Sequence, residues 1–520
     1  MKMKVVPILL LFVTLFGSLN GEKLLLIFHS PSKSHYFLGN ELAKGLAKLG
    51  HEVTIVAPFE EKNPPKNYRN IVLENVETEL GNNLRRNLFE LDNIPPFYQL
   101  LFLFSSPLQG ISELVLNNVK IQNLLKSNET FDAVILDQTL NDALKWFAYH
   151  FKVPLILLWS QGANRYVNNP VANPQNPSYI VDMFLNFNTP MTFYERFYNF
   201  VFGAMQDLIL YYYLEPNQNK ILKKYMPDAP DLGDPQYNVS LVICNSHESI
   251  YEALPHVPNM IDIGGFHVNP SEKLSKDLKK FMDNAKEGVI YFSMGSILKP
   301  SNMPKDKKDI ILKVLGSRKE KVLWKWDEDQ LENKPDNVMI SKWFPQHSIL
   351  AHPNCKLFIT HGGLLSTTET VYFGVPVLAF PMFGDQNSNA ERITAKGFGL
   401  KMKFAELTEE SLTEALVKLL EDPTYLEKAK HASALLHDRP LKPIELADYW
   451  IKYVIRHKGA PHLRVAGVNL PLYKYYMIDV LAVILGVLLV AFLVIRSLYR
   501  RVFRIKSSEC QKIPFEKKKN

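Results

Sequence analysis

The chain has 520 residues, of which 47% are hydrophobic, and its formal net charge at pH 7 is +7. This length exceeds what one core usually organises, and the apolar fraction is ordinary for a globular protein, so two lobes are expected. Residues 496–520 hold nine Lys and Arg against two Glu, so this segment alone carries the net charge of +7. The net positive charge therefore lies in one terminal tail. It does not indicate a nucleic-acid-binding surface on the rest of the chain. Three cysteines exclude a disulfide framework, and no zinc-ligand spacing occurs.

Residues 1–21 have the layout of a signal peptide. Lys2 and Lys4 precede an apolar run at 5–16, and small or polar residues follow it. The run is too short for a comfortable membrane span, so cleavage is expected, with an uncleaved anchor as the alternative.

The first lobe, expected over residues 22–268, opens with a βαβ unit. A strand at 23–28 and a loop at 29–34 lead into a helix, which Gly50 ends, and the next strand covers 52–57. Further continuous apolar runs are typical of parallel strands that are covered on both faces. These runs cover 131–136, 154–158 and 241–245.

Two side chains suited to proton transfer follow strands of this lobe. His35 starts the helix after the first strand, and Asp137 directly follows the strand at 131–136. Because the carboxyl ends of parallel strands share one rim, a carboxylate behind the imidazole could orient it and stabilise the imidazolium. His35 is therefore the candidate general base and Asp137 its partner. A helix-capping histidine and a strand-end carboxylate are the structural alternatives, and His29 is the rival base.

A polar, Lys-rich segment at 269–286 opens with Asn-Pro and is the expected linker. A second βα series, the expected second lobe, covers 287–457, and its last helix, 443–457, is amphipathic and should return along the lobes. Strands are expected at 289–293, 322–326, 338–341, 357–360 and 375–380, and charged helices at 408–420 and 424–437.

The turn His361-Gly-Gly363 joins the strand at 357–360 to a helix at 364–373. Its glycines let the backbone approach a ligand, and free N–H groups at the positive helix end favour a phosphate. Trp343 offers a ring to stack on a base, and the carboxylates of Glu369 and Asp385 suit hydroxyl groups. In open α/β sheets ligands bind at this edge, so the pattern predicts a nucleotide-sugar site. The candidate donor-binding residues are Ser296, Trp343, Gln346, His361, Gly363, Glu369, Asp385 and Gln386.

The stretch from Trp343 to about Gly399 resembles the signature of the UDP-glycosyltransferases, the family that includes the UDP-glucuronosyltransferases. Ser34-His35-Tyr36, ahead of Gly50-His51-Glu52-Val53, is similar to the catalytic-histidine region of that family. The resemblance implies an α/β, GT-B-like fold of two doubly wound, Rossmann-like lobes facing a cleft. It also implies that His35 and Asp137 are catalytic.

On the donor side, the resemblance implies that Trp343 stacks on uracil with Gln346 nearby. Ser296, His361 and the N–H groups around Gly363 would contact the diphosphate. Glu369 would hold the ribose hydroxyls, and Asp385-Gln386 would hold those of the sugar.

Direct in-line attack by an acceptor hydroxyl would invert the anomeric centre and give a β-glycoside. No metal or other cofactor is expected if the helix end and His361 supply the positive charge. Asp327-Glu-Asp329 matches an Asp-x-Asp pattern that binds a metal–nucleotide in another glycosyltransferase class, but its charged surroundings favour a solvated loop.

Leu365 stands where vertebrate glucuronosyltransferases usually carry Asn, and it cannot hydrogen-bond a glucuronate or phosphate oxygen. With Ser30-Pro-Ser-Lys-Ser34, it resembles the insect members of the family, which favour UDP-glucose. We therefore expect glucose transfer to a small lipophilic acceptor, as in detoxification. The alternatives are UDP-glucuronate as donor, an inactive UDP-sugar-binding membrane protein, and an epimerase or hydrolase on the same fold.

Residues 81–120 and 171–215 fit the βα alternation poorly, and the second segment is rich in Phe and Tyr. Its aromatic residues could be helical core, line an acceptor pocket for flat apolar molecules, or rest on a membrane lipid surface. The sequence leaves the acceptor and any homo-oligomer open.

Residues 475–495 are almost entirely apolar, and as a helix they would reach about 31 Å, enough to cross a bilayer. The basic tail at 496–520 would then face the cytosol and the lobes the lumen. Lys517-Lys-Lys-Asn520 resembles a di-lysine retrieval signal, which predicts a single-pass type I protein of the endoplasmic reticulum. Asn128-Glu-Thr130 and Asn238-Val-Ser240 are candidate glycosylation sites. Cys244 and Cys355 are expected to be free, buried thiols.

Overall fold

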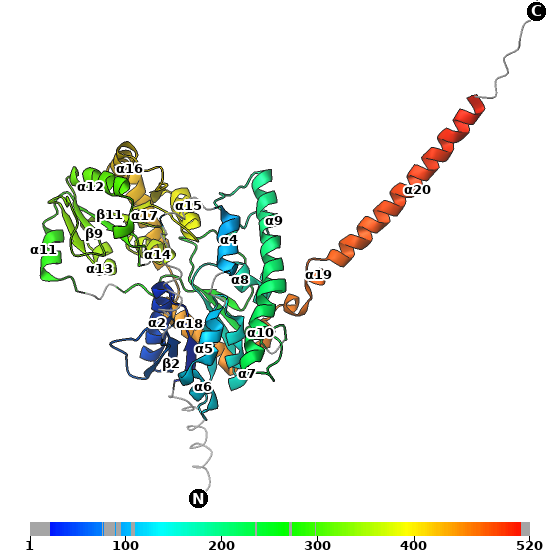
Figure 1. The fold of residues 1–520 in the computed structure, drawn as a ribbon, viewed down its shortest axis with the longest axis horizontal. Helices are drawn as coiled ribbons and strands as arrows, with labels where there is room; N and C mark the ends of the chain where they lie inside the picture. The colour runs from blue at the N-terminus through cyan, green and yellow to red at the C-terminus, as the bar shows by residue number, and fades with distance from the viewer. Residues whose placement is uncertain are drawn as a thin grey trace, which may run out of the picture. The chain divides into compact units, whose positions relative to one another are not determined.

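The structure is a computed structural model that describes residues 21–74, 76, 89, 95–105, 110–234, 237–269, 273–296 and 298–510. Nearly all of the expected signal peptide and the last ten residues of the basic tail lie outside the described residues. The chain divides after Arg464 into a compact body and a C-terminal segment that starts at Val465. The body contains two parallel sheets (Figure 1).

The first sheet has seven parallel strands in the order β3-β2-β1-β4-β5-β6-β7. Its central strands are apolar apart from Lys23 at the start of β1 and Asp137 at the end of β4, and they are buried on both faces, as expected for a sheet between helical layers. The strands are β1 (Lys23–Ile27), β2 (Glu52–Ala57), β3 (Tyr68–Val72), β4 (Ala133–Asp137), β5 (Leu155–Trp159), β6 (Leu241–Cys244) and β7 (Met260–Asp262).

The helices of this first lobe lie between its strands in the sequence. Helix α2 (Lys33–Lys48) packs closely on β1, because a Cβ at Gly39 would lie 2.3 Å from the ring of Phe28. Gly50 has a φ of +100° and ends the helix, as predicted. The others are α4 (Pro96–Ser105), α5 (Ile111–Asn117), α6 (Val119–Lys126), α7 (Trp146–Phe151), α8 (Arg165–Asn168), α9 (Phe193–Ile209) and α10 (Glu215–Tyr225). A π-helical turn, η5 (Leu210–Leu214), joins α9 to α10.

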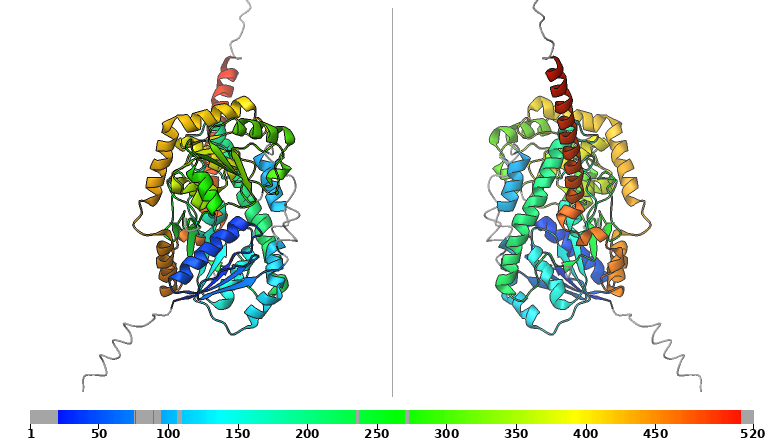
Figure 2. Two further views of the ribbon diagram at one scale, coloured as in Figure 1. Left: turned by 90° about the vertical axis from the view of Figure 1, so that its left-hand side faces the viewer. Right: turned by 90° about the vertical axis from the view of Figure 1, so that its right-hand side faces the viewer.

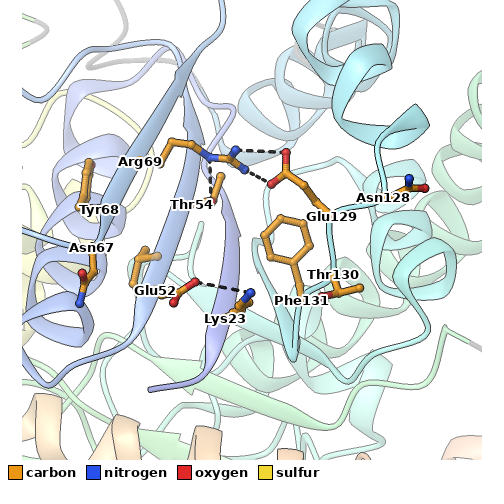
Figure 3. A pocket seen from close by; sticks show the side chains of 11 residues that line it. Lys23, Glu52, Thr54, Asn67, Tyr68, Arg69, Asn128, Glu129, Thr130 and Phe131 are labelled. Atoms are coloured by element: carbon orange, nitrogen blue, oxygen red, sulfur yellow. Dashed lines mark hydrogen bonds and ion pairs between the residues drawn. The ribbon is translucent and has the colours of Figure 1, made fainter. Parts of the chain in front are cut away.

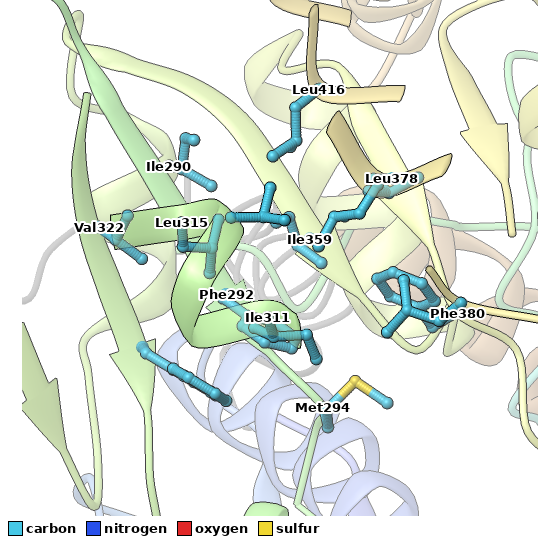
Figure 4. Packing of buried hydrophobic residues seen from close by; sticks show 14 of the residues in the cluster. Ile290, Phe292, Met294, Ile311, Leu315, Val322, Ile359, Leu378, Phe380 and Leu416 are labelled. Carbon is cyan, nitrogen blue, oxygen red and sulfur yellow. The ribbon is translucent and has the colours of Figure 1, made fainter. Parts of the chain in front are cut away.

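The second sheet has six parallel strands in the order β10-β9-β8-β11-β12-β13. They are β8 (Val289–Ser293), β9 (Lys321–Lys325), β10 (Val338–Ser341), β11 (Cys355–Thr360), β12 (Val377–Ala379) and β13 (Gly399–Lys401). Its core includes Ile290, Ile359 and Leu378, which pack against Leu315 and Leu416 from the covering helices (Figure 4). The helices are α11 (Lys276–Asp283), α12 (Lys305–Gly316), α13 (Gln346–Leu350), α14 (Leu364–Phe373), α15 (Gln386–Lys396), α16 (Glu409–Glu421) and α17 (Pro423–His437).

Helix α18 (Pro443–Arg456) returns from the second lobe to the first. Ala447, Ile451 and Val454 are buried in the core of the first lobe, with Leu42 and Leu46 of α2. Both views of Figure 2 show this orange helix beside the blue elements of that lobe. Helix α18 therefore belongs to the core of the first lobe, and the second lobe ends before it. The sequence analysis had placed the end of the second lobe at residue 457.

The segment 269–286, expected to be a linker, contains a helix. Leu278 and Met282 of α11 are buried against β8 and β9 of the second sheet. The connection between the lobes is thus shorter than predicted. The segment is Lys-rich, but its apolar residues Leu278 and Met282 lie four positions apart on one helical face, and this face packs on the second sheet.

The C-terminal segment contains α19 (Leu472–Tyr475) and α20 (Ile478–Cys510). Residues Ile478–Arg501 of α20 form a helix that is long and apolar enough to cross a membrane. The apolar helix begins at Ile478, whereas the sequence analysis placed its start at residue 475. Within the body, Cys244 and Cys355 are free and buried, as predicted.

Candidate functional site

A pocket of about 560 Å³ lies where the carboxyl ends of both sheets face each other. The first lobe contributes the start of α2 and the turns that follow β2 and β5, and the second contributes the end of β9, the turns that follow β8, β10 and β11, and the start of α15. Nine of the ten predicted site residues line this pocket: His35, Ser296, Trp343, Gln346, His361, Gly363, Glu369, Asp385 and Gln386. The tenth, Asp137, lies directly behind His35.

His35 and Asp137 form a hydrogen-bonded pair. Nδ1 of His35 lies 3.1 Å from Oδ2 and 3.2 Å from Oδ1 of Asp137, which is the last residue of β4. The hydroxyl of Thr139 donates to both carboxylate oxygens at 3.3 Å, which fixes their orientation. Because Nδ1 faces the carboxylate, Nε2 is the ring nitrogen left for a substrate.

The surroundings of His35 favour its protonated form. Burial lowers the pKa of the imidazole, but the Asp137 carboxylate and, more weakly, Asp385 from the second lobe raise it, and the net pKa is above its ordinary value. The rival base, His29, is fully buried and is absent from the residues that line the pocket. Burial lowers the pKa of His29 to about 4, and Asn141 contacts its Nδ1 at 3.3 Å.

The His361 ring is held between two glycines. A Cβ at Gly295 would lie 2.5 Å from its Cε1, and a Cβ at Gly363 would lie 2.6 Å from its Nε2. Gly362 has a φ of +78°, which turns the chain from β11 into α14, and Gly363 is the N-cap of that helix. Free N–H groups at the start of α14 and the ring of His361 therefore share one corner of the pocket.

His361 is a neutral group in this pocket. Burial, and then the nearby charge of Lys325, lower its pKa to about 4. A neutral imidazole can donate a hydrogen bond to a phosphate, but it does not supply the positive charge that the sequence analysis assigned to it.

Lys325 supplies a cation that the sequence analysis did not assign to the site. It is the last residue of β9, its Nζ donates to the carbonyl of Gly295 at 2.9 Å, and it lies 4.4 Å from the centroid of the Trp343 ring. Burial and the proximity of Lys33 lower its pKa to about 8. Its position at the carboxyl end of a parallel strand is the signal that could have identified it.

Glu369, on α14, is buried and held by neighbours from two other segments, α13 and the turn that follows β7. Nε2 of Gln346 donates to its Oε2, and Nε2 of His347 lies 3.2 Å from its Oε1. Burial would raise the pKa of this carboxyl, but hydrogen bonding from His347 and Gln346 and the charge of His267 hold it below its ordinary value. His267, which the sequence analysis missed, is fully buried, with Nε2 3.8 Å from Oε1 of Glu369.

Asp385 and Gln386 follow β12 and open α15. Asp385 accepts a hydrogen bond from Asn389 at 2.8 Å, and burial raises its pKa. The carbonyl oxygen of the Gln386 side chain accepts the backbone N–H groups of Met382 and Phe383, so its amide nitrogen is the group left for a ligand. Both residues thus lie at the start of α15, where the Gln386 side chain fixes the preceding turn and Asn389 fixes the Asp385 carboxylate.

Two other features lie outside this pocket. Asp327, of the Asp-x-Asp pattern, accepts hydrogen bonds from the backbone and hydroxyl of Ser301, at 2.9 Å and 2.6 Å. A second hollow of about 490 Å³ lies at the amino ends of β1 and β2, opposite the candidate site (Figure 3). Across the residues that the structure describes, no group of three or more His, Cys, Asp or Glu could hold a metal ion.

Comparisons with known proteins agree with this geometry. The family model described as UDP-glucoronosyl and UDP-glucosyl transferase matches residues 32–512. UDP-glycosyltransferase UGT5 of Dactylopius coccus is 36% identical over 90% of both chains, and UDP-glucosyltransferase 2 of the same insect is 33% identical over 92% of both. Human UDP-glucuronosyltransferase 1A6 is 29% identical over 93% of this chain and 92% of its own.

Two solved structures share the fold. The kitacinnamycin glycotransferase has a TM-score of 0.54 at 16% identity and covers 83% of this chain and 99% of its own. The glycosyltransferase VinC, solved with dTDP, has a TM-score of 0.53 at 15% identity and covers 84% of this chain and 100% of its own. These likenesses confirm the predicted arrangement of two Rossmann-like lobes.

Proposed function

We propose that this chain, which belongs to the family of UDP-glucuronosyl and UDP-glucosyl transferases, moves glucose from UDP-glucose to a hydroxyl group of a small lipophilic acceptor. The His35–Asp137 pair at the pocket wall is the observation that carries the proposal. This pair places a general base of the first lobe in the same pocket as the donor-binding turns of the second lobe.

The acceptor hydroxyl gives its proton to Nε2 of His35 as its oxygen attacks the anomeric carbon. The bond between that carbon and the diphosphate breaks on the opposite face, so the configuration inverts and UDP leaves. Asp137 stabilises the imidazolium that forms, which is the role of a carboxylate behind a catalytic imidazole. The raised pKa of His35 supports this role, because it makes the ring a better proton acceptor.

The departing diphosphate needs positive charge and hydrogen-bond donors. We assign the charge to Lys325 and to the start of α14, and the hydrogen bonds to His361, Ser296 and the N–H of Gly363. Trp343, whose ring lies 4.4 Å from the ammonium group of Lys325, would stack on uracil. Glu369, kept ionised by its neighbours, would accept from the ribose hydroxyls, and Asp385 with Gln386 would bind the sugar.

Glucose is favoured over glucuronate by Leu365. This apolar side chain lines the pocket beside Ser366, where it offers no hydrogen bond to a sugar carboxylate. Lys33 lines the same pocket and is the residue that favours the second candidate donor, UDP-glucuronate. On the side of the first lobe, Tyr36 and Phe59 line the pocket with rings 5.2 Å apart, and they would suit a flat apolar acceptor.

We further propose that the lobes face the lumen of the endoplasmic reticulum, with α20 as a single membrane span and the basic tail in the cytosol. Of the two glycosylation candidates, Asn128 is the better acceptor. It is exposed on the turn before β4, at the rim of the second hollow (Figure 3). The hydroxyl of Ser240, in the other sequon, is buried and accepts a hydrogen bond from Arg464 at 3.1 Å.

The test compares membranes that contain equal amounts of wild type, His35→Ala or His150→Ala. Each receives UDP-glucose or UDP-glucuronate with a panel of phenols and sterols, and glycoside formation is measured. His150 is the control, because it bonds the Leu125 carbonyl at 3.1 Å and is not among the residues that line the pocket. We expect the loss of the base to lower the rate by about 10²–10⁴-fold in His35→Ala alone.

Full activity of His35→Ala would remove His35 as the base. A wild type that binds UDP but transfers no sugar to any acceptor would favour the inactive binding protein. Faster transfer from UDP-glucuronate than from UDP-glucose would overturn the donor assignment.

A further inference from the structure

The outward face of α9 and η5 is built from large apolar side chains. Over 193–214 these include Phe193, Tyr194, Phe197, Phe200, Leu208 and Tyr212, with Tyr194 81% and Tyr212 69% exposed. Figure 1 shows α9 at the periphery of the body. At about 1.5 Å per residue, the segment presents an apolar stripe of about 33 Å.

The inward face of the same helix is largely polar, and Phe202 is the one large apolar side chain among its buried residues. Asn199 donates to the carbonyls of Pro177 and Ile180, both at 2.8 Å. Gln206 donates to Asp182 at 2.6 Å, and Asp207 pairs with Arg165. All three are buried. A helix at the surface of a water-soluble protein has the opposite arrangement, with its apolar stripe toward the core.

This arrangement bears on the three possibilities that the sequence left open for these aromatic residues: helical core, acceptor pocket or membrane surface. Among the described residues that line the candidate site, none comes from 171–215. The aromatic side chains therefore do not form the walls of that pocket. Phe184 and Phe202 are buried core, whereas the aromatic residues of the outward face are exposed. An outward apolar face of this size marks a surface that another apolar phase covers.

A lipid bilayer is the apolar phase that the C-terminal apolar helix would bring close to the body. Only residues 465–477 separate the last residue of the body from the apolar helix at Ile478–Arg501. Thirteen residues span at most about 45 Å, so a bilayer crossed by α20 always lies within reach of the body. Tyr and Phe are suited to this contact, because rings with a polar tip settle at the level of the lipid headgroups.

We propose that the outward face of α9 and η5 lies in the headgroup region of the bilayer that α20 crosses, and so fixes the body on the membrane surface. This inference rests on the proposed membrane anchoring. It does not depend on which sugar is transferred.

The test introduces a tryptophan into the full-length protein, reconstituted in phosphatidylcholine vesicles with or without dibrominated acyl chains. Phe197→Trp and Tyr212→Trp probe the two ends of the stripe. Tyr449→Trp is the control, because Tyr449 is 49% exposed on α18, whose apolar residues face the core in the usual way. The emission added by each tryptophan is obtained by subtracting wild type.

We expect brominated lipid to lower the added emission of both α9–η5 variants at least twofold and to leave that of Tyr449→Trp unchanged. Unquenched emission at both positions, equal to that of the control, would overturn the proposal and favour a second protein on this face. If wild type fails to float with the vesicles, the anchoring and this inference fall together. Sugar transfer by the same preparation, measured in parallel, reports on the proposed reaction alone.

Discussion

His35 combines two opposing influences, and their balance sets the pH at which it can act as a base. Burial disfavours the imidazolium, whereas Asp137 favours it, and the carboxylate prevails. A general base must be neutral to accept a proton, so activity should rise with pH as His35 loses its proton. The midpoint of that rise should lie above the ordinary histidine pKa of about 6.5.

Asp137→Asn tests this balance. The substitution removes the charge that raises the pKa of His35 but leaves its burial, so the midpoint of the pH–rate profile should move to lower pH. The rate at its plateau should fall by about 10³–10⁴-fold, because the imidazolium loses its stabilising partner. A profile of kcat/KM against pH measures both effects. An unchanged midpoint would show that Asp137 does not set the pKa of the catalytic group.

Lys325 makes a separate prediction at the donor end. Lys325→Gln should raise the KM for the UDP-sugar by about 10–100-fold, the loss expected for one charged hydrogen bond to phosphate. Lys321→Gln is a matched control, because Lys321 starts the same strand, donates to the Phe281 carbonyl at 3.2 Å and lies over the Phe281 ring. Rescue by Lys325→Arg would identify charge as the property that matters. Equal KM values for the Lys325→Gln and Lys321→Gln variants would contradict the assignment.

The residues that sequence reasoning found and those it missed differ in how they reach the pocket. His361 and Asp137 lie directly at the ends of apolar strands, and Asp385 lies on the turn beyond the end of β12, so the strand-end rule finds them. Lys325 obeys the same rule, but its acidic neighbours suggested a solvated loop. His267 reaches Glu369 only through the packing of one lobe on the other, and no local pattern in the sequence predicts such a contact.

At the scale of elements, the missed strands share one property. β3, β7 and β13 all lie at sheet edges, and the three-residue strands β7 and β13 are too short to show an apolar run. Edge strands are short and partly polar because one side has no partner, so hydrophobic pattern alone does not find them. Helix α14 was predicted with its observed bounds, since a strand precedes it and Gly374, with a φ of +66°, ends it.

The start of α14 allows a test of how closely the His361 ring must be placed. Gly363 has a φ of −61°, so alanine introduces no backbone strain there, but its Cβ would lie 2.6 Å from the ring. Gly363→Ala should displace His361 and lower kcat/KM by about 10²-fold, with little loss of stability. Gly110→Ala is the control, because Gly110 is also an N-cap, with a φ of −75°, and a Cβ there meets open space. Kinetics and thermal melting of both variants separate displacement of the ring from unfolding, and normal kinetics for Gly363→Ala would show that the ring need not stay fixed.

At the scale of the whole molecule, α18 links the end of the second lobe to the core of the first. Its polar anchor is Asp448, whose Oδ1 lies 2.6 Å from Nε2 of the fully buried His51. Nδ1 of the same ring accepts the backbone N–H of Glu22 at 3.0 Å, beside the start of β1. His51 therefore joins the first strand of the body to its last α-helix, which gives a structural role to a histidine that lines neither of the two described pockets.

Asp448→Ala should weaken this link. Removing the acceptor leaves a buried imidazole nitrogen without its partner, at a cost of about 1–3 kcal/mol in the free energy of unfolding. Arg456→Ala, at an exposed position of the same helix, should change that free energy by less than about 0.5 kcal/mol. Chemical denaturation measures both, and equal stability of the two variants would show that α18 is held by its apolar face alone.

The same pair predicts how the stability of wild type depends on pH. Burial would raise the pKa of Asp448, but hydrogen bonds from His51 and Lys452 hold it below its ordinary value. A carboxyl whose folded pKa is depressed stabilises the fold above its unfolded pKa, and this contribution is lost as the pH falls through the folded pKa. The stability difference between wild type and Asp448→Ala should therefore shrink as the solution is acidified below about pH 4. A difference that stays constant down to the acid transition would mean that the contact acts through packing, and α18 would then join the lobes in the same way at every pH.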